Sequence, residues 1–472
     1  MNRVRILYVL VRFPFLVLWL GVFCRAQASP QGQWSALENW PTRAIHTTLL
    51  PDGRVFFFSY YNESLAPNIW DPATNTFSPT APAPYALFCA GHTTLADGRV
   101  FIAGGHIADY TGYSHAVIYD PFRNTMTQVP DMNEGRWYPT TTVLANGDVL
   151  VVSGDVNSNT VVDPLPQVFQ VATGTWRNLT SAQLMQALYP VMLVAPNVKV
   201  VYAGPEPQSR YLVTSGSGAW SPLALRKFSG WRDYGPGVMY DVGKILEVGG
   251  GDPPTATAET IDLTAATPTW NLVGSMHYAR RQENAVILPD GKVFIVGGSS
   301  GSGFDDSTHP VLPTEMWNPA TGQFTLMASI AVYRGYHSTA LLLPDGRVMT
   351  YGNNPGDGSY NEKISIYSPP YLFHGARPQI KSVASPTAWH YGKSYNLKTN
   401  QKIVSAELIR PAAVTHQSDP NQRYVALSIS GNGTSVGLNV TSNHNMAPPG
   451  WYMLFVNNAN GVPSVAKWIH LS

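Results

Sequence analysis

The sequence predicts an all-β protein, and three observations support this fold class. Glycine and proline are abundant (41 and 38 residues) and charged residues make up only 12%, which is typical of short strands joined by tight turns. A unit of two apolar strands around a turn recurs seven times along the chain. After the N-terminal leader, no segment shows convincing helical periodicity. The net charge of +1 gives no charged surface that would indicate nucleic acid as a partner.

The N-terminal segment has the features of an export signal. Two arginines precede an apolar run over residues 6–24, and Ala26-Gln27-Ala28 is typical of a cleavage site. We expect residues 1–28 to be a signal peptide, so that the mature chain begins near Ser29. An uncleaved N-terminal anchor is the alternative, because the run approaches the roughly 20 apolar residues that span a bilayer. Both readings predict a secreted, periplasmic or cell-surface protein, with no further domain before the first repeat.

The seven repeat units predict a β-propeller. Asp-Gly and Asn-Gly turns supply the positive φ of a tight hairpin, and the turn positions lie 45 to 55 residues apart. The turn positions are Gly53, Gly98, Gly147, Asn197, Gly243, Gly291 and Gly346. A second hairpin between successive turns, such as IWDPATNTF or MWNPATGQF, ends on an aromatic residue, so each unit offers four strands. Repeats of this kind match kelch-type blades. We therefore predict a closed seven-bladed kelch-type propeller over residues 29–376.

The repeat stops before the last hundred or so residues. Strand patterns such as AELIR, SVGLNV and WYMLFVNN follow in their place. They predict a small immunoglobulin-like β-sandwich over residues 377–472. We expect a monomer, because a closed propeller leaves no long unpaired strand edge.

One cysteine remains once the leader and its Cys24 are removed. Cys89 cannot form an internal disulfide, so its thiol is idle, intermolecular or used in chemistry. Counting back nine residues from each turn compares equivalent sites on the strands that lead into the turns. These sites are Ala44, Cys89, Tyr138, Leu188, Tyr234, Gln282 and His337. If the strands are the innermost ones, the sites form one ring around the propeller axis.

The ring contains side chains suited to redox or metal chemistry. Histidine and phenolate, with few carboxylates, suit a copper site of tetragonal geometry, and such a site needs a second histidine. Tyr336 adjoins His337, although neighbours on a regular strand face opposite ways. The pair therefore predicts a bulge or a strand end at this position.

Four motifs resemble those of one enzyme family. They are FCAGHTTLADG, GRWYPTTT, YRGYHSTALLLPDGRV and AELIRPAAVTHQSDPNQRYVALSIS. In these motifs, and over nearly the whole mature chain, the protein resembles the galactose oxidase and glyoxal oxidase family of copper radical oxidases. The wording RWYP leans toward the glyoxal oxidase branch.

The resemblance implies one copper ion and a self-processed cofactor. Cys89 and Tyr138 would form a thioether that carries a protein radical. Tyr138, His337 and His416 would be the equatorial copper ligands and Tyr336 the axial one. Tyr336 would accept the hydroxyl proton, while the Tyr138 radical takes hydrogen from carbon. The implied reaction oxidises a primary alcohol, a small aldehyde or a glycan hydroxyl with O2, which leaves as hydrogen peroxide.

The residues that contact the substrate are less sharply defined. Arg280, in MHYARRQENAV, falls where galactose oxidase carries an arginine that binds sugar hydroxyls, and Arg281 stands beside it. Phe304, in GFDDST, resembles a pocket-lining phenylalanine of the family. The tryptophan that shields the radical in galactose oxidase has no counterpart in GDVNSNTVV, so we expect Trp231 to cover the cofactor instead.

Other readings of the same residues stay open. A lone cysteine is most often a small buried hydrophobe, and buried tyrosines are usually core residues with satisfied hydroxyls. A propeller with a sandwich could also be a non-catalytic binder of glycan or protein, because a fold does not fix a function. A propeller hydrolase is a third reading, although no carboxylate pair stands in the ring. The joint occurrence of the metal-binding and redox-active residue types favours the oxidase.

Overall fold

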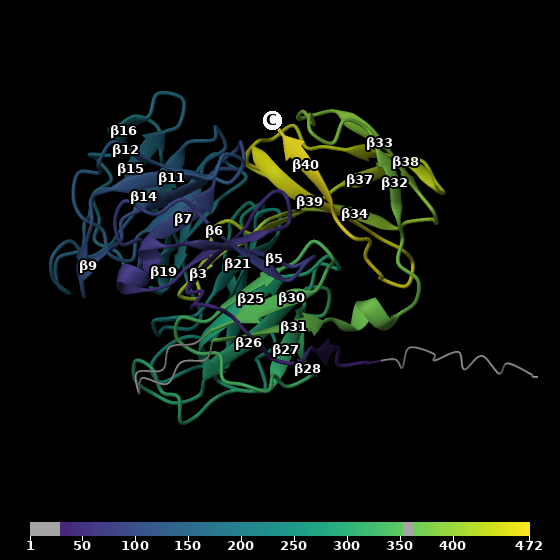
Figure 1. Cartoon of the computed structure of the whole chain (residues 1–472), viewed down its shortest axis with the longest axis horizontal. Helices are drawn as coiled ribbons and strands as arrows, with labels where there is room; N and C mark the ends of the chain where they lie inside the picture. The colour runs from purple at the N-terminus through teal and green to yellow at the C-terminus, as the bar shows by residue number, and fades with distance from the viewer. Residues whose placement is uncertain (1–28, 353–361) are drawn as a thin grey trace, which may run out of the picture.

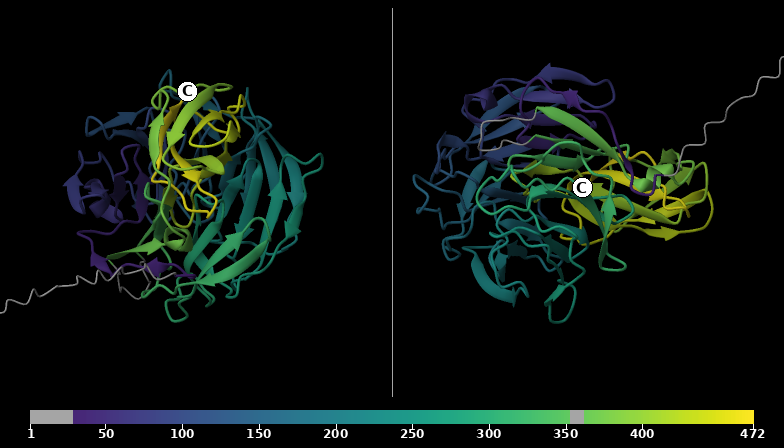
Figure 2. Two further views of the ribbon diagram at one scale, coloured as in Figure 1. Left: turned by 90° about the vertical axis from the view of Figure 1, so that its right-hand side faces the viewer. Right: turned by 90° about the horizontal axis from the view of Figure 1, so that it is seen from below.

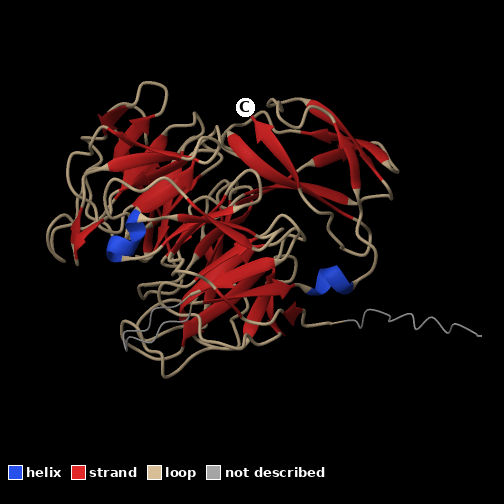
Figure 3. Cartoon of the chain, in the orientation of Figure 1, coloured by secondary structure: helices blue, strands red, loops and turns tan. Residues whose placement is uncertain are grey.

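The computed structural model describes residues 29–352 and 362–472, and nearly all of their regular structure is β-strand (Figure 3). In these two ranges the helical turns are η1 (Tyr61–Leu65) and η2 (Pro370–Phe373). None of the helices described there has the length and apolar character needed to cross a membrane. The prediction of an all-β protein is confirmed, and the leader predicted over residues 1–28 lies outside the described residues.

Six groups of four antiparallel strands follow one another along the chain (Figures 1 and 2). Their strands, in chain order, are β3 (His46–Leu49), β4 (Val55–Phe58), β5 (Asn68–Asp71) and β6 (Thr76–Pro79); β7 (Gly91–Thr94), β8 (Val100–Ala103), β11 (Ala116–Asp120) and β12 (Thr125–Val129); β13 (Thr140–Val143), β14 (Val149–Val152), β15 (Gln167–Gln170) and β16 (Thr175–Asn178); β17 (Val191–Val194), β18 (Val200–Gly204), β19 (Gln208–Val213) and β20 (Ala219–Leu225); β21 (Gly237–Asp241), β22 (Lys244–Val248), β23 (Ala258–Asp262) and β24 (Trp270–Leu272); β25 (Arg281–Ile287), β26 (Val293–Ser299), β27 (Thr314–Asn318) and β28 (Gln323–Met327). The first and the fifth group each pair with one further strand from the C-terminal region. A separate small hairpin follows β8, formed by β9 (His106–Ala108) and β10 (Thr111–Gly112).

The seventh sheet joins the two ends of the repeat region. Its strands are β29 (Thr339–Leu342), β30 (Val348–Tyr351) and β31 (Lys363–Ser368), with β1 (Gln33–Trp34) and β2 (Glu38–Asn39) paired to β31. The Thr339 hydroxyl donates to the Ala44 carbonyl at 3.4 Å, which links this sheet to the first. The chain thus forms one sheet per repeat unit, and closure into a complete ring stays a prediction that this pairing supports.

The inner strands of the sheets are buried on both faces. In β4, for example, all of Val55–Phe58 is buried, and apolar residues on successive sheets pack against each other. A strand that is buried on both faces has an unbroken run of β-branched and aromatic residues, and these strands show such runs in the sequence. The outer strands are more exposed, as in β12. The core therefore lies between sheets and toward the middle of the repeat region.

One turn lies one residue further along the chain than predicted. The residue with positive φ in the fourth unit is Val198 (φ 65°), in place of Asn197, and it takes the position that glycine occupies in the other six units. A β-branched residue is strained in this left-handed conformation, which is why the turn was predicted at the neighbouring asparagine. Every position counted back from this turn shifts by one.

The C-terminal strands form two sheets that pack face to face (Figure 1). One sheet has β32 (Ile380–Val383), β33 (Ser394–Thr399), β38 (Ser435–Asn439) and β37 (Ser428–Ser430), and the other has β36 (Arg423–Ala426), β34 (Ser405–Arg410), β39 (Gly450–Asn457) and β40 (Lys467–Leu471). Leu397 and Leu438 from the first sheet meet Leu408 and Leu454 from the second in a shared core. The sandwich prediction is thereby confirmed, while the boundary at residue 376 stays a prediction.

A loop between β34 and β36 extends from the sandwich into the middle of the repeat region. Its short strand β35 (Ala413–Thr415) pairs with β3 of the first sheet. The Gln422 side chain accepts from the Ile287 amide at 3.0 Å and donates to the Ala285 carbonyl at 2.9 Å, both on the sixth sheet. The Asp419 carboxylate accepts the amides of Ala413, Asn421 and Gln422 at 3.0–3.2 Å, which fixes the loop's shape. Sheets far apart in the sequence therefore hold this one loop.

Candidate metal centre

The residue that precedes or begins each inner strand has a left-handed backbone in most sheets. The φ angles of Cys89, Tyr138, Tyr234, Gln282 and His337 lie between 55° and 65°. Hydrogen bonds join these residues across sheets, since the Tyr138 amide donates to the Cys89 carbonyl at 2.9 Å and the Gln282 amide to the Tyr234 carbonyl at 3.0 Å. A left-handed residue breaks the strict alternation of strand side chains, so Tyr336 and His337 both reach the same group, as the predicted strand end requires.

Tyr189 occupies the fourth position of this ring, and the prediction of Leu188 there is wrong. The Tyr189 amide donates to the Tyr138 carbonyl at 2.9 Å, which repeats the Tyr138–Cys89 link. The cause is the turn at Val198, from which nine residues back is Tyr189. The sequence contained a usable signal, because Tyr189-Pro190 repeats Tyr138-Pro139 at the same point of the unit.

Two tyrosines and two histidines from distant segments meet in one buried group. The hydroxyls of Tyr138 and Tyr336 are hydrogen-bonded to each other. The rings of His337 and His416 lie 4.4 Å apart between centroids, at 86° to each other. The His416 ring also lies 4.4 Å from the Tyr138 ring, and the His337 ring lies 3.8 Å from the Tyr336 ring. All four side chains are almost completely buried.

The sandwich loop delivers His416 to this group. His416 follows β35 directly and has φ 48°, so the chain turns sharply and directs the imidazole at the ring residues. Its Nδ1 is held by the Thr415 hydroxyl at 2.6 Å. Its Nε2 is buried and has no hydrogen-bond partner among the described residues. One nitrogen is therefore fixed by the protein while the other is left for a ligand.

Burial sets the protonation of these side chains. It lowers the pKa of His337 to about 3, and it lowers the pKa of His416 well below its ordinary value, with His337 and His46 adding to the effect. Both imidazoles are therefore neutral, which is the form that binds metals. Burial also raises the pKa of Tyr138 and of Tyr336 well above that of free tyrosine.

Cys89 lies against Tyr138, as the sequence predicts. The thiol is fully buried and free of any disulfide, and the two residues share one apolar cluster with Trp137 and Tyr189. Burial raises the pKa of the Cys89 thiol well above its ordinary value, and hydrogen bonding to Tyr138 opposes this shift. The Cys89 amide donates to His46 Nε2 at 3.1 Å, a contact that the sequence did not indicate.

Trp137 stacks on Tyr138 and was missed by the sequence analysis. The two rings lie 3.6 Å apart between centroids, at 9° to each other, and the Trp137 indole N–H donates to His106 Nδ1 at 3.1 Å. Trp231, which we expected to cover the cofactor, lies on a cavity wall and is 52% exposed. Trp137 therefore covers one face of the Tyr138 ring, and the covering role of Trp231 stays a prediction. It directly precedes Tyr138 in GRWYP, so adjacency alone was the available signal.

The structure separates the two neighbouring arginines. Arg280, which we expected to contact the substrate, is completely buried and pairs with Glu315 at 2.7 Å. It therefore does not reach the buried tyrosines and histidines. Arg281 instead extends toward the ring residues, with its guanidinium 5.4 Å from the centroid of the Tyr234 ring. Phe304 does lie at the site, since its ring is 4.5 Å from that of Tyr336 and it remains 57% exposed.

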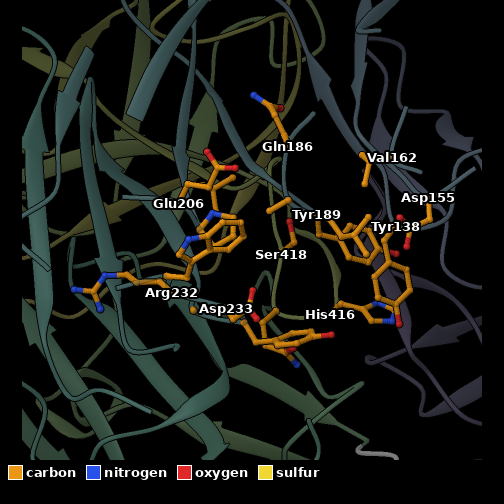
Figure 4. A pocket seen from close by; sticks show the side chains of 18 of the residues that line it. Tyr138, Asp155, Val162, Gln186, Tyr189, Glu206, Arg232, Asp233, His416 and Ser418 are labelled. Carbon is orange, nitrogen blue, oxygen red and sulfur yellow. The ribbon is translucent and has the colours of Figure 1, made fainter. Parts of the chain in front are cut away.

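A cavity of about 460 Å³ opens onto the buried group (Figure 4). Tyr138, Tyr189 and His416 form one part of its wall, and Trp231 and Tyr234 belong to another part. Three carboxylates, those of Asp155, Glu206 and Asp233, also line it. Burial raises the pKa of Asp155 to about 6. A small organic molecule can therefore reach Tyr138 and His416 from outside.

The donors in the group fit copper. Two neutral imidazoles and two phenol oxygens are nitrogen and oxygen ligands of the kind that copper takes in tetragonal geometry. The partnerless Nε2 of His416 points to a bound ion, since a buried polar atom without a partner is otherwise unfavourable. Across residues 29–352 and 362–472, no three His, Cys, Asp or Glu side chains form a metal-binding cluster. The tyrosines therefore have to complete any metal site here.

Comparisons with known proteins agree with this site. The family model "Galactose oxidase-like, Early set domain" matches residues 377–471, and "Glyoxal oxidase N-terminus" matches residues 249–371. Galactose oxidase of Gibberella zeae is 30% identical over 93% of this chain and 71% of its own length. Aldehyde oxidase GLOX1 of Arabidopsis thaliana is 26% identical over 80% of this chain and 62% of its own length. A fungal alcohol oxidase of the AA5 family, solved in complex with copper, superposes with a TM-score of 0.86 at 26% identity, covering 94% of this chain and 100% of that one.

The fold, the buried centre and these relatives define a copper-dependent oxidase. The chain belongs to the galactose oxidase family.

Proposed function

We propose that this protein works outside the cytoplasm and oxidises a primary alcohol or a small aldehyde with O2, which is reduced to hydrogen peroxide. The observation that carries the proposal is the convergence of Tyr138, Tyr336, His337 and His416 in one buried group, with Cys89 against Tyr138. The relatives are named as galactose, aldehyde and alcohol oxidases, which supports this range of substrates.

Four side chains would hold the metal. Tyr138, Tyr336, His337 and His416 would supply its two phenol oxygens and two imidazole nitrogens. When bound, copper supplies a one-electron acceptor and a Lewis acid next to the reacting oxygen. The Thr415 hydroxyl fixes the His416 ring through Nδ1, so the free Nε2 keeps its direction without the metal.

The reaction removes two electrons and two protons from the substrate. Tyr336 accepts the proton of the substrate hydroxyl at its own phenol oxygen. A radical on Tyr138 would take a hydrogen atom, and with it one electron, from the adjacent carbon. The second electron would pass to the one-electron acceptor that copper supplies, so that a carbonyl forms. Dioxygen receives the two electrons and two protons and leaves as hydrogen peroxide. An aldehyde enters the same scheme as its hydrate, which also presents a hydroxyl on a carbon that carries hydrogen.

A thioether between Cys89 and Tyr138 is the proposed site of the radical. Forming it joins the Cys89 sulfur to a ring carbon of Tyr138 and removes one hydrogen from each, with dioxygen as the oxidant. The bond would spread the unpaired electron onto sulfur and so stabilise the radical. Trp137 covers the face of the same phenol at 3.6 Å and limits contact with water.

Intact mass after exposure to copper and air tests the proposal. We expect the mass to fall by two hydrogen atoms, and we expect digestion to yield a peptide that joins Cys89 to Tyr138. Adding a primary alcohol should release hydrogen peroxide. The Cys89→Ser variant should keep its fold, show no mass change and lose most of its peroxide release. Unmodified Cys89 and Tyr138 peptides in copper-loaded, air-exposed protein would refute the radical site. A copper-loaded protein that is silent with both alcohols and aldehydes would refute the oxidase.

A further inference from the structure

The wall of the cavity carries more acidic than basic side chains, and Asp155 is the acid there that has no cationic partner among the described residues. Asp155, Glu206 and Asp233 line the cavity. Arg232 is the one basic side chain among the lining residues, but it is fully buried and bound to Glu259 at 2.9 Å. Figure 4 shows the Arg232 guanidinium directed away from Tyr138 and His416. The electrostatic potential inside the cavity is therefore negative.

Asp155 is a buried acceptor without a donor. Its side chain is among the most enclosed in the wall, with the residue only 2% exposed. Its backbone pairs with Trp137 in both directions at 2.8 Å, which places it beside Tyr138. No described residue donates a hydrogen bond to its carboxylate or pairs with it as a cation. A carboxylate with so little exposed surface and no protein donor is stabilised by a ligand that supplies one from the cavity.

Gln186 is a second lining residue whose side chain has no polar partner in the described part of the chain. It is 4% exposed, and neither its side-chain oxygen nor its side-chain nitrogen has a hydrogen-bond partner among the described residues. Its amide group is enclosed by protein, and Figure 4 shows it directed away from Tyr138 and His416. Asp155 is therefore the unpartnered polar side chain that faces the reacting end of the cavity.

The outer part of the cavity combines acids with exposed aromatic rings. Asp233 is 3.9 Å from Arg281, but Arg281 makes its closer contact with Asp252, at 2.9 Å. Glu206 pairs with Arg210 at 3.2 Å. Trp231 and Tyr110 present large exposed rings on the same wall. Aromatic faces beside carboxylates attract cations more strongly than they attract neutral molecules.

We propose that the cavity selects substrates that carry a primary ammonium group, so that the oxidised molecule is an amino alcohol or the corresponding amino aldehyde. The ammonium donates to the Asp155 carboxylate, while its hydroxyl carbon faces Tyr138. A neutral sugar or alcohol would leave the buried charge of Asp155 without a counter-ion. This inference rests on the proposed oxidase function for its reaction, but the binding step itself needs neither copper nor the radical.

The test measures binding to the copper-free protein by isothermal titration calorimetry at about pH 8, where an alkyl ammonium and a carboxylate are both charged. The probes are ethanolamine, its neutral isostere n-propanol, and the anion glycolate. We expect ethanolamine to bind roughly tenfold more tightly than n-propanol, with glycolate the weakest, and we expect the preference to shrink in high salt. Equal binding of ethanolamine and n-propanol, or tighter binding of glycolate, would overturn the proposal.

Two variants locate the preference. Asp155→Asn should bring ethanolamine binding down to that of n-propanol without changing the latter. Asp131→Asn is the matched control, because Asp131 is an exposed acid outside the cavity that pairs with His115. A folded Asp155→Asn protein that keeps the full ammonium preference contradicts the proposal. The comparison of the three probes on the unaltered protein stands even where that variant does not fold.

The two proposals fail in different ways. If ethanolamine binds preferentially to the copper-free protein but the copper-loaded protein releases no peroxide, the ammonium site is supported and the oxidase is refuted. If ethanolamine and n-propanol bind equally and release peroxide at the same rate, the oxidase is supported and the ammonium site is refuted.

Discussion

The indole of Trp137 lies flat on the phenol of Tyr138, with the ring centroids 3.6 Å apart and the planes 9° apart. On the same phenol, Tyr189 stacks at 4.6 Å and 28°. The side chain proposed to carry the radical is thus in contact with two further aromatic rings, one of which is its immediate neighbour in the sequence.

Replacing Trp137 by leucine should shorten the life of the Tyr138 radical. An aromatic pair contributes about 1 kcal/mol beyond the area that it buries, and its loss also admits water to the ring. We expect the Tyr138 radical to decay several-fold faster. The protein is first exposed to copper and air, then freed of copper and oxidised, so that electron paramagnetic resonance records the radical without the copper spin. Trp231→Leu should leave the decay unchanged. Faster decay in the Trp231 variant alone would restore Trp231 as the shielding residue.

Removing the Thr415 hydroxyl should weaken copper binding. Thr415→Val breaks the 2.6 Å contact with His416 Nδ1, so the imidazole loses its fixed orientation. Losing a partner of this type lowers metal affinity by about 10–100-fold. Competition with a copper chelator measures the change. Thr141→Val serves as the control, since the Thr141 hydroxyl is also buried but has no hydrogen-bond partner among the described residues. Equal copper affinity in the two variants would contradict the role of Thr415.

The buried Glu283 should make the protein less stable as the pH rises. Burial raises its folded-state pKa to about 8, whereas a glutamate in the unfolded chain has a pKa near 4.3. Between these values the folded state holds a proton that the unfolded state has released, so the free energy of unfolding falls with increasing pH.

Glu283→Gln removes that proton exchange. The melting temperature of this variant relative to the unaltered protein should therefore rise from about pH 5 to about pH 8, by a few degrees in total. Glu134→Gln, at an exposed glutamate, is the control and should show no such trend. A constant difference between Glu283→Gln and the unaltered protein across this range would contradict the assignment.

Val198→Gly should stabilise the fourth sheet. Valine at φ 65° is strained by about 1–2 kcal/mol, and glycine removes this strain at the expense of about 0.5–1 kcal/mol of chain entropy. The net gain is expected to be about 1 kcal/mol or less, measured by urea unfolding.

The reverse change at an equivalent turn is the matched comparison. Gly147 has φ 87°, and an added Cβ would meet only Pro449 Cγ at 3.6 Å, so packing does not interfere. Gly147→Val should destabilise by about 1–2 kcal/mol. A destabilising Val198→Gly would mean that Val198 has a packing role that outweighs its strain.

The sheets could be predicted from sequence because their signals are local. A glycine turn between two apolar runs marks a hairpin wherever it occurs, as at Gly98 and Gly291. Equivalent positions in repeated units then share a location, which placed Cys89, Tyr138 and His337 together. The exception at Val198 arose because the strained residue type is rare at such a turn, so the count from it was one residue short.

The parts of the site that depend on tertiary context were harder to predict. His416 comes from another sheet system, and only the resemblance to a known family indicated it. The choice between Arg280 and Arg281 turned on the left-handed Gln282, which alters the direction of side chains at the start of β25. The stacking of Trp137 on Tyr138 breaks the expectation that neighbours on a strand diverge. No local pattern encodes any of these three.

The position of His416 near the C-terminal end has a consequence for biosynthesis. A chain emerging from the ribosome presents Cys89, Tyr138 and His337 long before the sandwich loop exists, and β3 then lacks its neighbour β35. Because domains fold as they are made, the early sheets assemble while one imidazole is still missing. The nascent polypeptide therefore lacks the full set of donor atoms until the sandwich loop has been translated, which separates folding of the early sheets from maturation of the reactive centre.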